Sequence, residues 1–150
     1  MEALNEVVDE RELVLERCRS LYEIFMDTSA LDDEIAEHVR ECEILTELTR
    51  RLVKENAQQG MDQDEFMRKY GSYVSKYDRE SAKVEKLKAH RTERLQKAEA
   101  VSAFMFEIHE QDGLLQEFDV KLWLTTIDKI RISHDGQMTY IFNNGMKVAR

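Results

Sequence analysis

The sequence predicts a mainly α-helical fold: a long antiparallel coiled-coil hairpin with a preceding N-terminal helix and a small C-terminal antiparallel β-meander. The 150 residues include no proline and only five glycines, so the usual helix breakers are scarce. An apolar heptad pattern runs through most of residues 62 to 108, which is typical of a coiled coil. Only the end, "LWLTTIDKIRISHDGQMTYIFNNGMKVAR", alternates like a sheet and turns on glycine.

Two helices are predicted before residue 60. The first covers residues 2 to 27 and carries one apolar stripe. Its members are Leu4, Val7, Val14, Cys18, Leu21 and Phe25. The segment "DTSALDDE" interrupts this stripe, because Thr28 or Ser29 caps a second helix and the acids that follow suit the positive end of its dipole. The second helix reaches about residue 59 and is ended by Gly60. Its apolar positions are Leu31, Ile35, Cys42, Leu45, Leu48 and Leu52.

A third, longer helix is predicted to begin at Asp62, which has Glu65 three positions later as in a capping box. Its seam advances in alternating steps of four and three residues. The seam positions are Phe66, Tyr70, Tyr73, Tyr77, Glu80, Val84, Leu87, Arg91, Arg94, Ala98, Val101, Met105 and Ile108. Such a helix exceeds ~65 Å at 1.5 Å per residue, so we expect a long helical partner. The alternative is one long amphipathic helix on a globular core.

Charge indicates that the second and third helices are each other's partners. If the chain folds back at residues 60 to 62, residues whose numbers add up to about 122 lie opposite each other in the hairpin. Residues 31–47, which hold seven acidic residues against one arginine, then face residues 75–91, which are rich in lysine and arginine. Exposed ion pairs contribute little free energy, so this charge pattern indicates which helices pair and in which register, more than it indicates stability. In the rival interpretation the basic run faces DNA, although its own acids and its acidic neighbour would compete with phosphate.

The tail is predicted to form a short helix followed by a β-meander. Phe118 and Asp119 look like the staple and cap of a helix at about residues 120 to 127. Asp135-Gly136 and Asn144-Gly145 form the two turns. We expect the ribbon core to consist of Trp123, Ile130, Ile132, Tyr140 and Phe142. A sheet this small is marginal alone and leaves edges open to another strand or domain.

No active site is recognisable in the sequence. The histidines lack a nucleophile or carboxylate at a catalytic spacing, and no glycine-rich phosphate loop occurs, so we expect no catalytic, cofactor-binding or metal residues and no enzyme activity. Cys18 and Cys42 are interpreted as packing thiols, although His38 and Cys42 lie one helical turn apart and are in principle able to share a metal.

Charge and hydropathy limit the partners. The net charge of −9 argues against the chain binding nucleic acid unaided. No apolar run reaches the ~18 residues of a membrane span and no signal-peptide pattern opens the chain, so we expect a cytoplasmic protein without a membrane partner.

The segment "VSAFMFEI…EFDVKLWLTTIDKIRISHDGQMTYIFNNGMKV" resembles the C-terminal end of the large serine recombinases, the integrases and transposases of phages and mobile elements. That family has a phenylalanine-centred helix, an F-D-x-x-L-W segment, a valine/isoleucine strand, an acidic-glycine turn, an aromatic strand and a closing glycine motif. The matching residues here are Phe104, Phe118, Asp119, Leu122, Trp123, Ile127, Ile130, Ile132, Asp135, Gly136, Phe142, Gly145 and Val148. "MDQDEFMRKYGSYVSKYD" is similar to the start of the family's returning coiled-coil helix, whereas residues 1–60 match only in helical pattern.

The resemblance implies three segments: a helical entry segment at 1–30, an antiparallel coiled-coil arm at 31–110 with its turn near 60–62, and a short helix plus β-ribbon at 111–150. Family members also carry a catalytic serine domain, a DNA-binding domain and a zinc ribbon with four cysteines, and none of these is in this sequence. Zinc is therefore expected only in the preceding part of a parent protein, whose strands the β-tail would complete.

By resemblance, the arm contacts other recombinase subunits, controls synapsis and the direction of DNA recombination, and leaves DNA-site binding to the full-length parent. Weak self-association follows from this reading. Met61, Phe66 and Tyr70 are the candidate contact residues at the arm tip, with packing inside the hairpin as the alternative for all three. The alternative function is a free-standing coiled-coil adaptor that binds a protein partner and has no DNA role.

Overall fold

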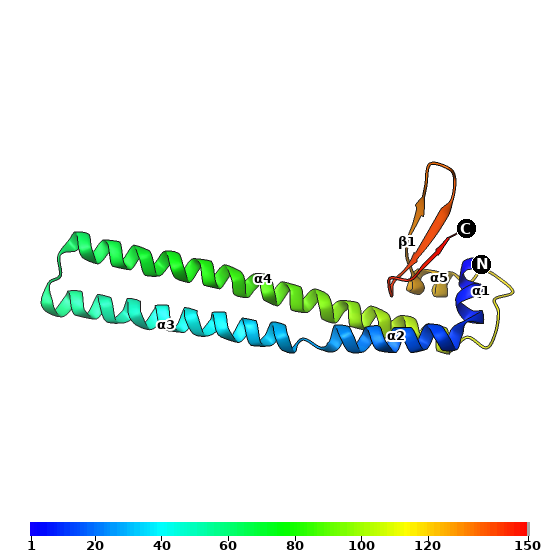
Figure 1. Cartoon of the computed structure of the whole chain (residues 1–150), viewed down its shortest axis with the longest axis horizontal. Helices are drawn as coiled ribbons and strands as arrows, with labels where there is room; N and C mark the ends of the chain where they lie inside the picture. Colours follow the sequence, from blue (N-terminus) through cyan, green and yellow to red (C-terminus); the bar gives the residue numbers. More distant parts are fainter. Residues whose placement is uncertain (150) are drawn as a thin grey trace. The chain divides into compact units, whose positions relative to one another are not determined.

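The computed structural model describes residues 1–149, which divide into two compact units (Figure 1). One unit, called here the helical arm, comprises Thr28–Glu93, and the other, called the base, comprises Met1–Asp27 together with the chain from Arg94 onward. The base therefore combines both ends of the chain with the last part of the long helix, whereas the predicted arm extends to residue 110. Mainly helical structure with a small C-terminal sheet confirms the predicted fold class.

The helical arm is an antiparallel pair formed by α3 (Ser29–Gln59) and the first part of α4 (Gln63–His109) (Figure 1). Gly60 ends α3 in the left-handed conformation, with φ of 62°, which glycine adopts without steric strain. Asp62 then begins α4, because its carboxylate accepts a hydrogen bond from the backbone N–H of Glu65 at 2.9 Å. The turn is thus specified locally, as the sequence predicts.

The register of the arm agrees with the prediction. The Asp32 carboxylate contacts the Arg91 guanidinium at 2.6 Å, and His38 Nδ1 lies 2.6 Å from Glu80 Oε2. Leu45, Leu52 and Val84 are buried in the arm. These contacts between α3 and α4 confirm the antiparallel hairpin on which the fold prediction rests.

Ion pairing contributes less to this register than the sequence suggests. Asp32 does pair across the hairpin with Arg91, but several other charges pair with neighbours on their own helix. These pairs within a helix are Glu47 with Arg50 and Arg51, Glu65 with Lys69, Glu80 with Lys83, and Glu85 with Lys88. Pairs three or four residues apart stabilise a single helix, so the apolar seam carries more of the register than charge does.

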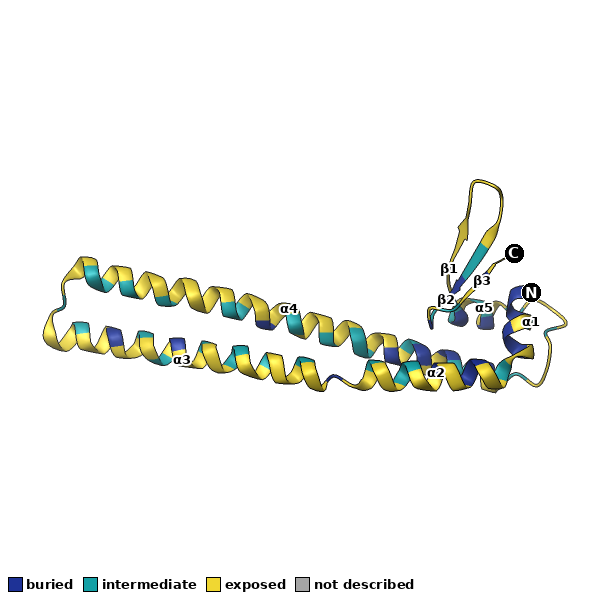
Figure 2. Cartoon of the chain, viewed as in Figure 1, coloured by how far each residue is buried: buried dark blue, intermediate teal, exposed yellow. Residues whose placement is uncertain are grey.

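The base is built around one hydrophobic core (Figure 2). It combines α1 (Glu2–Asp9), α2 (Arg11–Met26), residues 94–109 of α4, α5 (Val120–Thr126) and a three-stranded antiparallel sheet. The core residues are Ala3, Leu4, Val7, Val8, Val14, Leu15, Cys18, Val101, Phe104, Ile108, Leu122, Phe142 and Val148. Phe104 and Phe142 meet edge to face, with ring centroids 6.0 Å apart. The core thus joins segments from both ends of the chain.

The single N-terminal helix predicted for residues 2 to 27 is wrong. The helix breaks at Glu10, where φ is −89° and ψ is 21°, and α1 turns away from the direction of α2 (Figure 1). The residues around the break, Asp9 to Glu12, are all charged and contribute nothing to the core. The break lets the apolar face of α1 join the core near α5 and the sheet, which offsets the lost helical hydrogen bonds.

The connection between α4 and α5 is held by the N-terminal helices. The Asn5 side-chain amide donates to the Leu115 carbonyl at 3.2 Å, and its oxygen accepts from the Leu115 N–H at 2.7 Å. Arg11 Nη1 also donates to the Gln111 carbonyl at 2.6 Å. These polar contacts satisfy backbone groups of a segment without regular structure.

The tail folds largely as predicted. Asp119 caps α5 by accepting from the Leu122 N–H at 2.9 Å. The sheet has the order β1-β2-β3, with β1 at Ile127–Ile132, β2 at Met138–Phe142 and β3 at Lys147–Ala149. The turns before β2 and β3 place Gly136 and Gly145 at φ of 84° and 85°.

Two of the five residues predicted as ribbon core are not core residues. Phe142 is buried, and Trp123 and Tyr140 pack against the core, with their rings 6.0 Å apart. Ile130 and Ile132 are 40% and 66% exposed. The core covers only the end of the β1–β2 hairpin near Ile127 and Phe142 (Figure 2). The alternation of apolar and polar residues along β1 continues beyond the part that the core covers.

Candidate protein-interaction site

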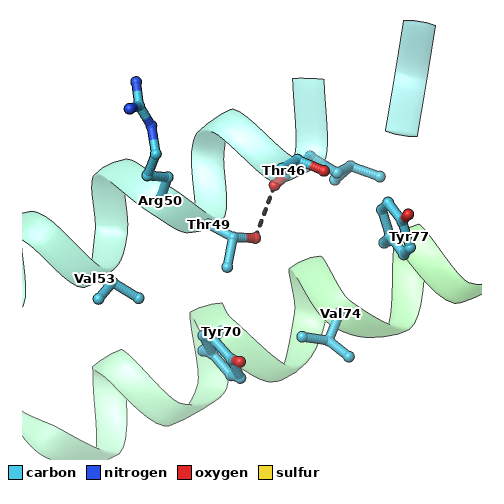
Figure 3. Close-up of a pocket in the computed structure, with 8 residues that line it drawn as sticks. Thr46, Thr49, Arg50, Val53, Tyr70, Val74 and Tyr77 are labelled. Atoms are coloured by element: carbon cyan, nitrogen blue, oxygen red, sulfur yellow. Dashed lines mark hydrogen bonds between the residues drawn. The ribbon is translucent and has the colours of Figure 1, made fainter. Parts of the chain in front are cut away.

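The half of the helical arm nearest the Gly60 turn contains an apolar groove of about 510 Å³ between α3 and α4 (Figure 3). Its walls are Leu45, Thr46, Thr49, Arg50, Val53, Tyr70, Val74 and Tyr77. Val53 and Thr49 project from α3 toward Tyr70 and Val74 of α4, whereas Arg50 points away from α4 (Figure 3). The groove therefore offers aliphatic and aromatic surface with the charged Arg50 at its rim.

The groove exists because a small residue occupies the seam of α3. The apolar stripe predicted for this helix includes Leu48, but Leu48 is exposed and Thr49 turns toward α4. The Thr49 hydroxyl donates to the Leu45 carbonyl at 2.7 Å, and the Thr46 hydroxyl donates to the Cys42 carbonyl at 2.8 Å. Both hydroxyls are thus satisfied within α3, and the groove keeps an apolar character.

The three predicted tip residues differ in their environment. Met61 is half-buried, and its backbone N–H donates to Asn56 Oδ1 at 3.2 Å. Phe66 is half-buried and stacks on Tyr70, with ring centroids 5.8 Å apart. Tyr70 is 38% exposed and also lines the groove. Met61 and Phe66 therefore pack within the hairpin, as in the alternative prediction. Of the three residues, only Tyr70 lines the groove.

Val53 and Val74 also line the groove, although neither is among the site residues predicted from the sequence. They are 46% and 38% exposed. In a two-helix coiled coil, positions flanking the seam are usually charged or polar. Branched apolar residues at such positions are the sequence signal that marks a third packing surface.

A second groove of about 550 Å³ adjoins the first on the same side of the arm and shares Thr46, Arg50 and Tyr77 with it. Charges surround its rim. Glu47 bridges Arg50 and Arg51, and hydrogen bonding from Arg51 lowers the pKa of its carboxyl. Glu85 and Lys88 form another rim pair at 3.4 Å. Mixed charge beside an apolar strip is typical of a surface that binds another helix.

A polar contact crosses the middle of the arm at His38 and Glu80. The Glu80 carboxylate accepts from Lys83 Nζ at 2.9 Å and lies 2.6 Å from His38 Nδ1. The Lys83 hydrogen bond and, after it, the His38 hydrogen bond lower the pKa of Glu80. His38 is engaged with this carboxylate rather than with Cys42, so the arrangement does not pair it with the thiol for metal binding.

Acid is expected to weaken the arm. Because the folded-state pKa of Glu80 lies below its ordinary value of 4.5, its contribution to stability is present above pH 4.5 and is lost as pH falls through the folded pKa. Asp32, Glu47 and Glu65 have lowered pKa values and act in the same direction. We expect the thermal midpoint followed by circular dichroism to fall below pH 4.5, and to fall less in Glu80→Gln than in the exposed control Glu85→Gln. Equal pH dependence in the two variants would contradict this role for Glu80.

The cysteines behave as packing groups. Cys18 is buried in the base, where burial raises the pKa of its thiol and a hydrogen bond from Asn144 Nδ2 at 3.2 Å partly opposes that rise. Cys42 is half-buried, and burial also raises its pKa. Within residues 1–149, no group of three metal-binding side chains is found. No helix in this described part is long and apolar enough to cross a membrane.

Comparisons of the chain with models of protein families, with curated proteins and with solved structures give no match.

Proposed function

We propose that the chain is the non-catalytic C-terminal region of a large serine site-specific recombinase, whose helical arm contacts other recombinase subunits when two DNA sites are brought together. The observation that carries this proposal is the apolar groove between α3 and α4, which leaves Tyr70, Val74 and Tyr77 open on the arm. The tail supports the family assignment: the cap at Asp119 and the glycine turns occur at the residues of the recombinase-like motif. In such a protein the arm contact controls synapsis and the direction of recombination.

The occupant of the groove is the equivalent arm of a second subunit. At the adjoining groove, α3 contributes the acidic Glu43 and Glu47, and α4 contributes the basic Lys88. A two-fold arrangement that places α3 of one arm beside α4 of the other brings opposite charges together twice. A groove of this size gives a small interface, which suits a reversible contact.

The sheet supports DNA-site binding only within a full-length parent. By register, Lys129, Arg131 and Lys147 share one face of the sheet. Lys129 also pairs with Asp128 at 3.0 Å, and the whole chain carries a net charge of −9. Three bases on an acidic chain supply few phosphate contacts, so the parent's other domains would provide most of the affinity.

The competing function is a free-standing coiled-coil adaptor that binds another protein and has no DNA role. The observation that favours this alternative is the same groove, because its apolar walls would accept a helix of an unrelated protein as well as a second arm. The DNA upstream of the codon for Met1 separates the two. A continuous reading frame that encodes paired cysteines and a serine catalytic domain supports the recombinase, and a promoter with a ribosome-binding site supports the adaptor.

Sedimentation of the full chain over a range of concentrations tests the arm contact. We expect weak self-association that Val74→Glu weakens by about tenfold or more, because a charge would be buried in an apolar contact. Met67→Glu is the matched control, since Met67 is 62% exposed on the same helix and does not line the groove. A chain that stays monomeric at all concentrations, or equal effects of the two variants, would reject arm pairing and leave the adaptor.

A further inference from the structure

Strand β1 presents an open edge of the sheet. Among residues 1–149 it pairs with β2 alone, and every residue from 128 to 138 is exposed. The Ser133 N–H donates to the Gln137 carbonyl, so in an antiparallel ladder with this register the backbone groups of Arg131 and Lys129 also point toward β2. The N–H and C=O groups of Ile130 and Ile132 therefore point outward. Such groups are a template for another strand.

The side chains along this edge differ between the two faces of the sheet. Ile130 and Ile132 lie on one face, opposite Tyr140 and Met138 of β2. This apolar face continues through Tyr140 to Trp123, which lies 5.4 Å from Phe118 by ring centroids. Lys129 and Arg131 lie on the other face. A strand that pairs with β1 would therefore lie beside isoleucine side chains on one face of the sheet and beside basic side chains on the other.

A second copy of β1 fits this edge poorly. Two identical antiparallel strands related by a two-fold axis normal to the sheet place residues of the same face opposite each other. Pairings centred on residues 129, 130 or 131 set Lys129 against itself, Lys129 against Arg131, or Arg131 against itself. A pairing centred on Ile132 avoids these clashes, but it runs beyond the end of β1 into the turn at residues 133–137. Like charges directly opposite destabilise strand pairing. The charge pattern thus favours a strand with acids at these positions.

We infer that β1 binds an extended segment of a partner protein in which acidic and apolar residues alternate, and that this segment adds a fourth strand to the sheet. Main-chain hydrogen bonds to Ile130 and Ile132 supply the pairing. Acids opposite Lys129 and Arg131, and apolar residues beside Ile130 and Ile132, supply the selectivity. This surface belongs to the base and is independent of the groove on the helical arm.

Amide hydrogen exchange of the full chain, followed by NMR, tests the inference with the acetylated and amidated peptide Thr-Glu-Val-Glu-Val-Glu-Thr. We expect the peptide to slow exchange of the Ile130 and Ile132 amides by about tenfold or more, because they become hydrogen-bonded. The Lys129 and Arg131 amides are the internal control, since they already point toward β2. The same peptide with lysine at the glutamate positions should give no protection, and N-methylation of its edge-facing amides should abolish binding.

Two protein variants make the test specific. Ile132→Pro removes an outward N–H and leaves the ladder with β2 intact, so we expect loss of peptide binding with the exchange of Thr139 unchanged. The double variant Lys129→Glu with Arg131→Glu should reverse the preference, so that the lysine peptide binds about tenfold more tightly than the glutamate peptide. Absence of protection at ~1 mM peptide, equal binding of the N-methylated peptide, or no reversal of preference would overturn the inference. Protection of the same amides by duplex DNA or by a second copy, without protection by the glutamate peptide, would overturn it as well.

Discussion

Replacing Phe104 with alanine is expected to lower the free energy of unfolding of the base by about 3–5 kcal/mol. Phe104 is fully buried, and its ring meets Phe142 edge to face at 6.0 Å. The substitution removes apolar contacts with both the helices and the sheet, and the surrounding segments are too constrained to fill the space. Urea unfolding followed by the fluorescence of Trp123, the one tryptophan of the sequence, which packs against the core of the base, measures the loss.

Phe106→Ala is the matched control for this experiment. Phe106 lies two residues away on the same helix, carries the same side chain and is 62% exposed. We expect its free energy of unfolding to stay within about 0.5 kcal/mol of the parent value. A similar loss for both variants would mean that the effect reflects helix propensity and not the core.

The features of the arm that the sequence predicts correctly are those with local causes. Gly60 ends one helix, Asp62 begins the next, and these two residues fix the point at which the chain reverses. Once the turn is placed, the heptad pattern determines the register that Asp32 and Arg91 display. Neither step requires knowledge of distant contacts, so a single sequence suffices for both.

The errors arise where tertiary packing decides between patterns that look alike in sequence. Leu48 and Thr49 both fit a seam that advances in steps of three and four, and the structure turns Thr49 inward, which opens the groove. Alternation along β1 identifies the two faces of the strand, but it does not show that the core ends before Ile132. The helix breaks at Glu10 although no glycine or proline, the usual helix-breaking residues, occurs there. In each case the competing packing is set by residues far away in the chain.

Deleting residues 31–90 and joining the ends is expected to leave the base folded and to abolish self-association. The core of the base contains residues only from α1, α2, the last part of α4, α5 and the sheet, and none from the helical arm. The Asp32–Arg91 and His38–Glu80 contacts lie within the arm, so the deletion breaks no core contact of the base. The joined ends leave residues 28–30 and 91–93 as the link, and connections of ~2–8 residues commonly join neighbouring antiparallel helices.

Two measurements separate folding of the base from function of the arm. In the shortened chain, the fluorescence of Trp123, the one tryptophan of the sequence, and slow amide exchange at Phe142 and Val148 should be retained, because all three residues pack in the base. Sedimentation should show a monomer at concentrations where the full chain associates, because the groove formed by α3 and α4 is gone. Loss of the protected amides would mean that the base depends on the arm for its stability. Association that survives the deletion would place the contact between subunits on the base, and the arm would then not be the element that joins recombinase subunits.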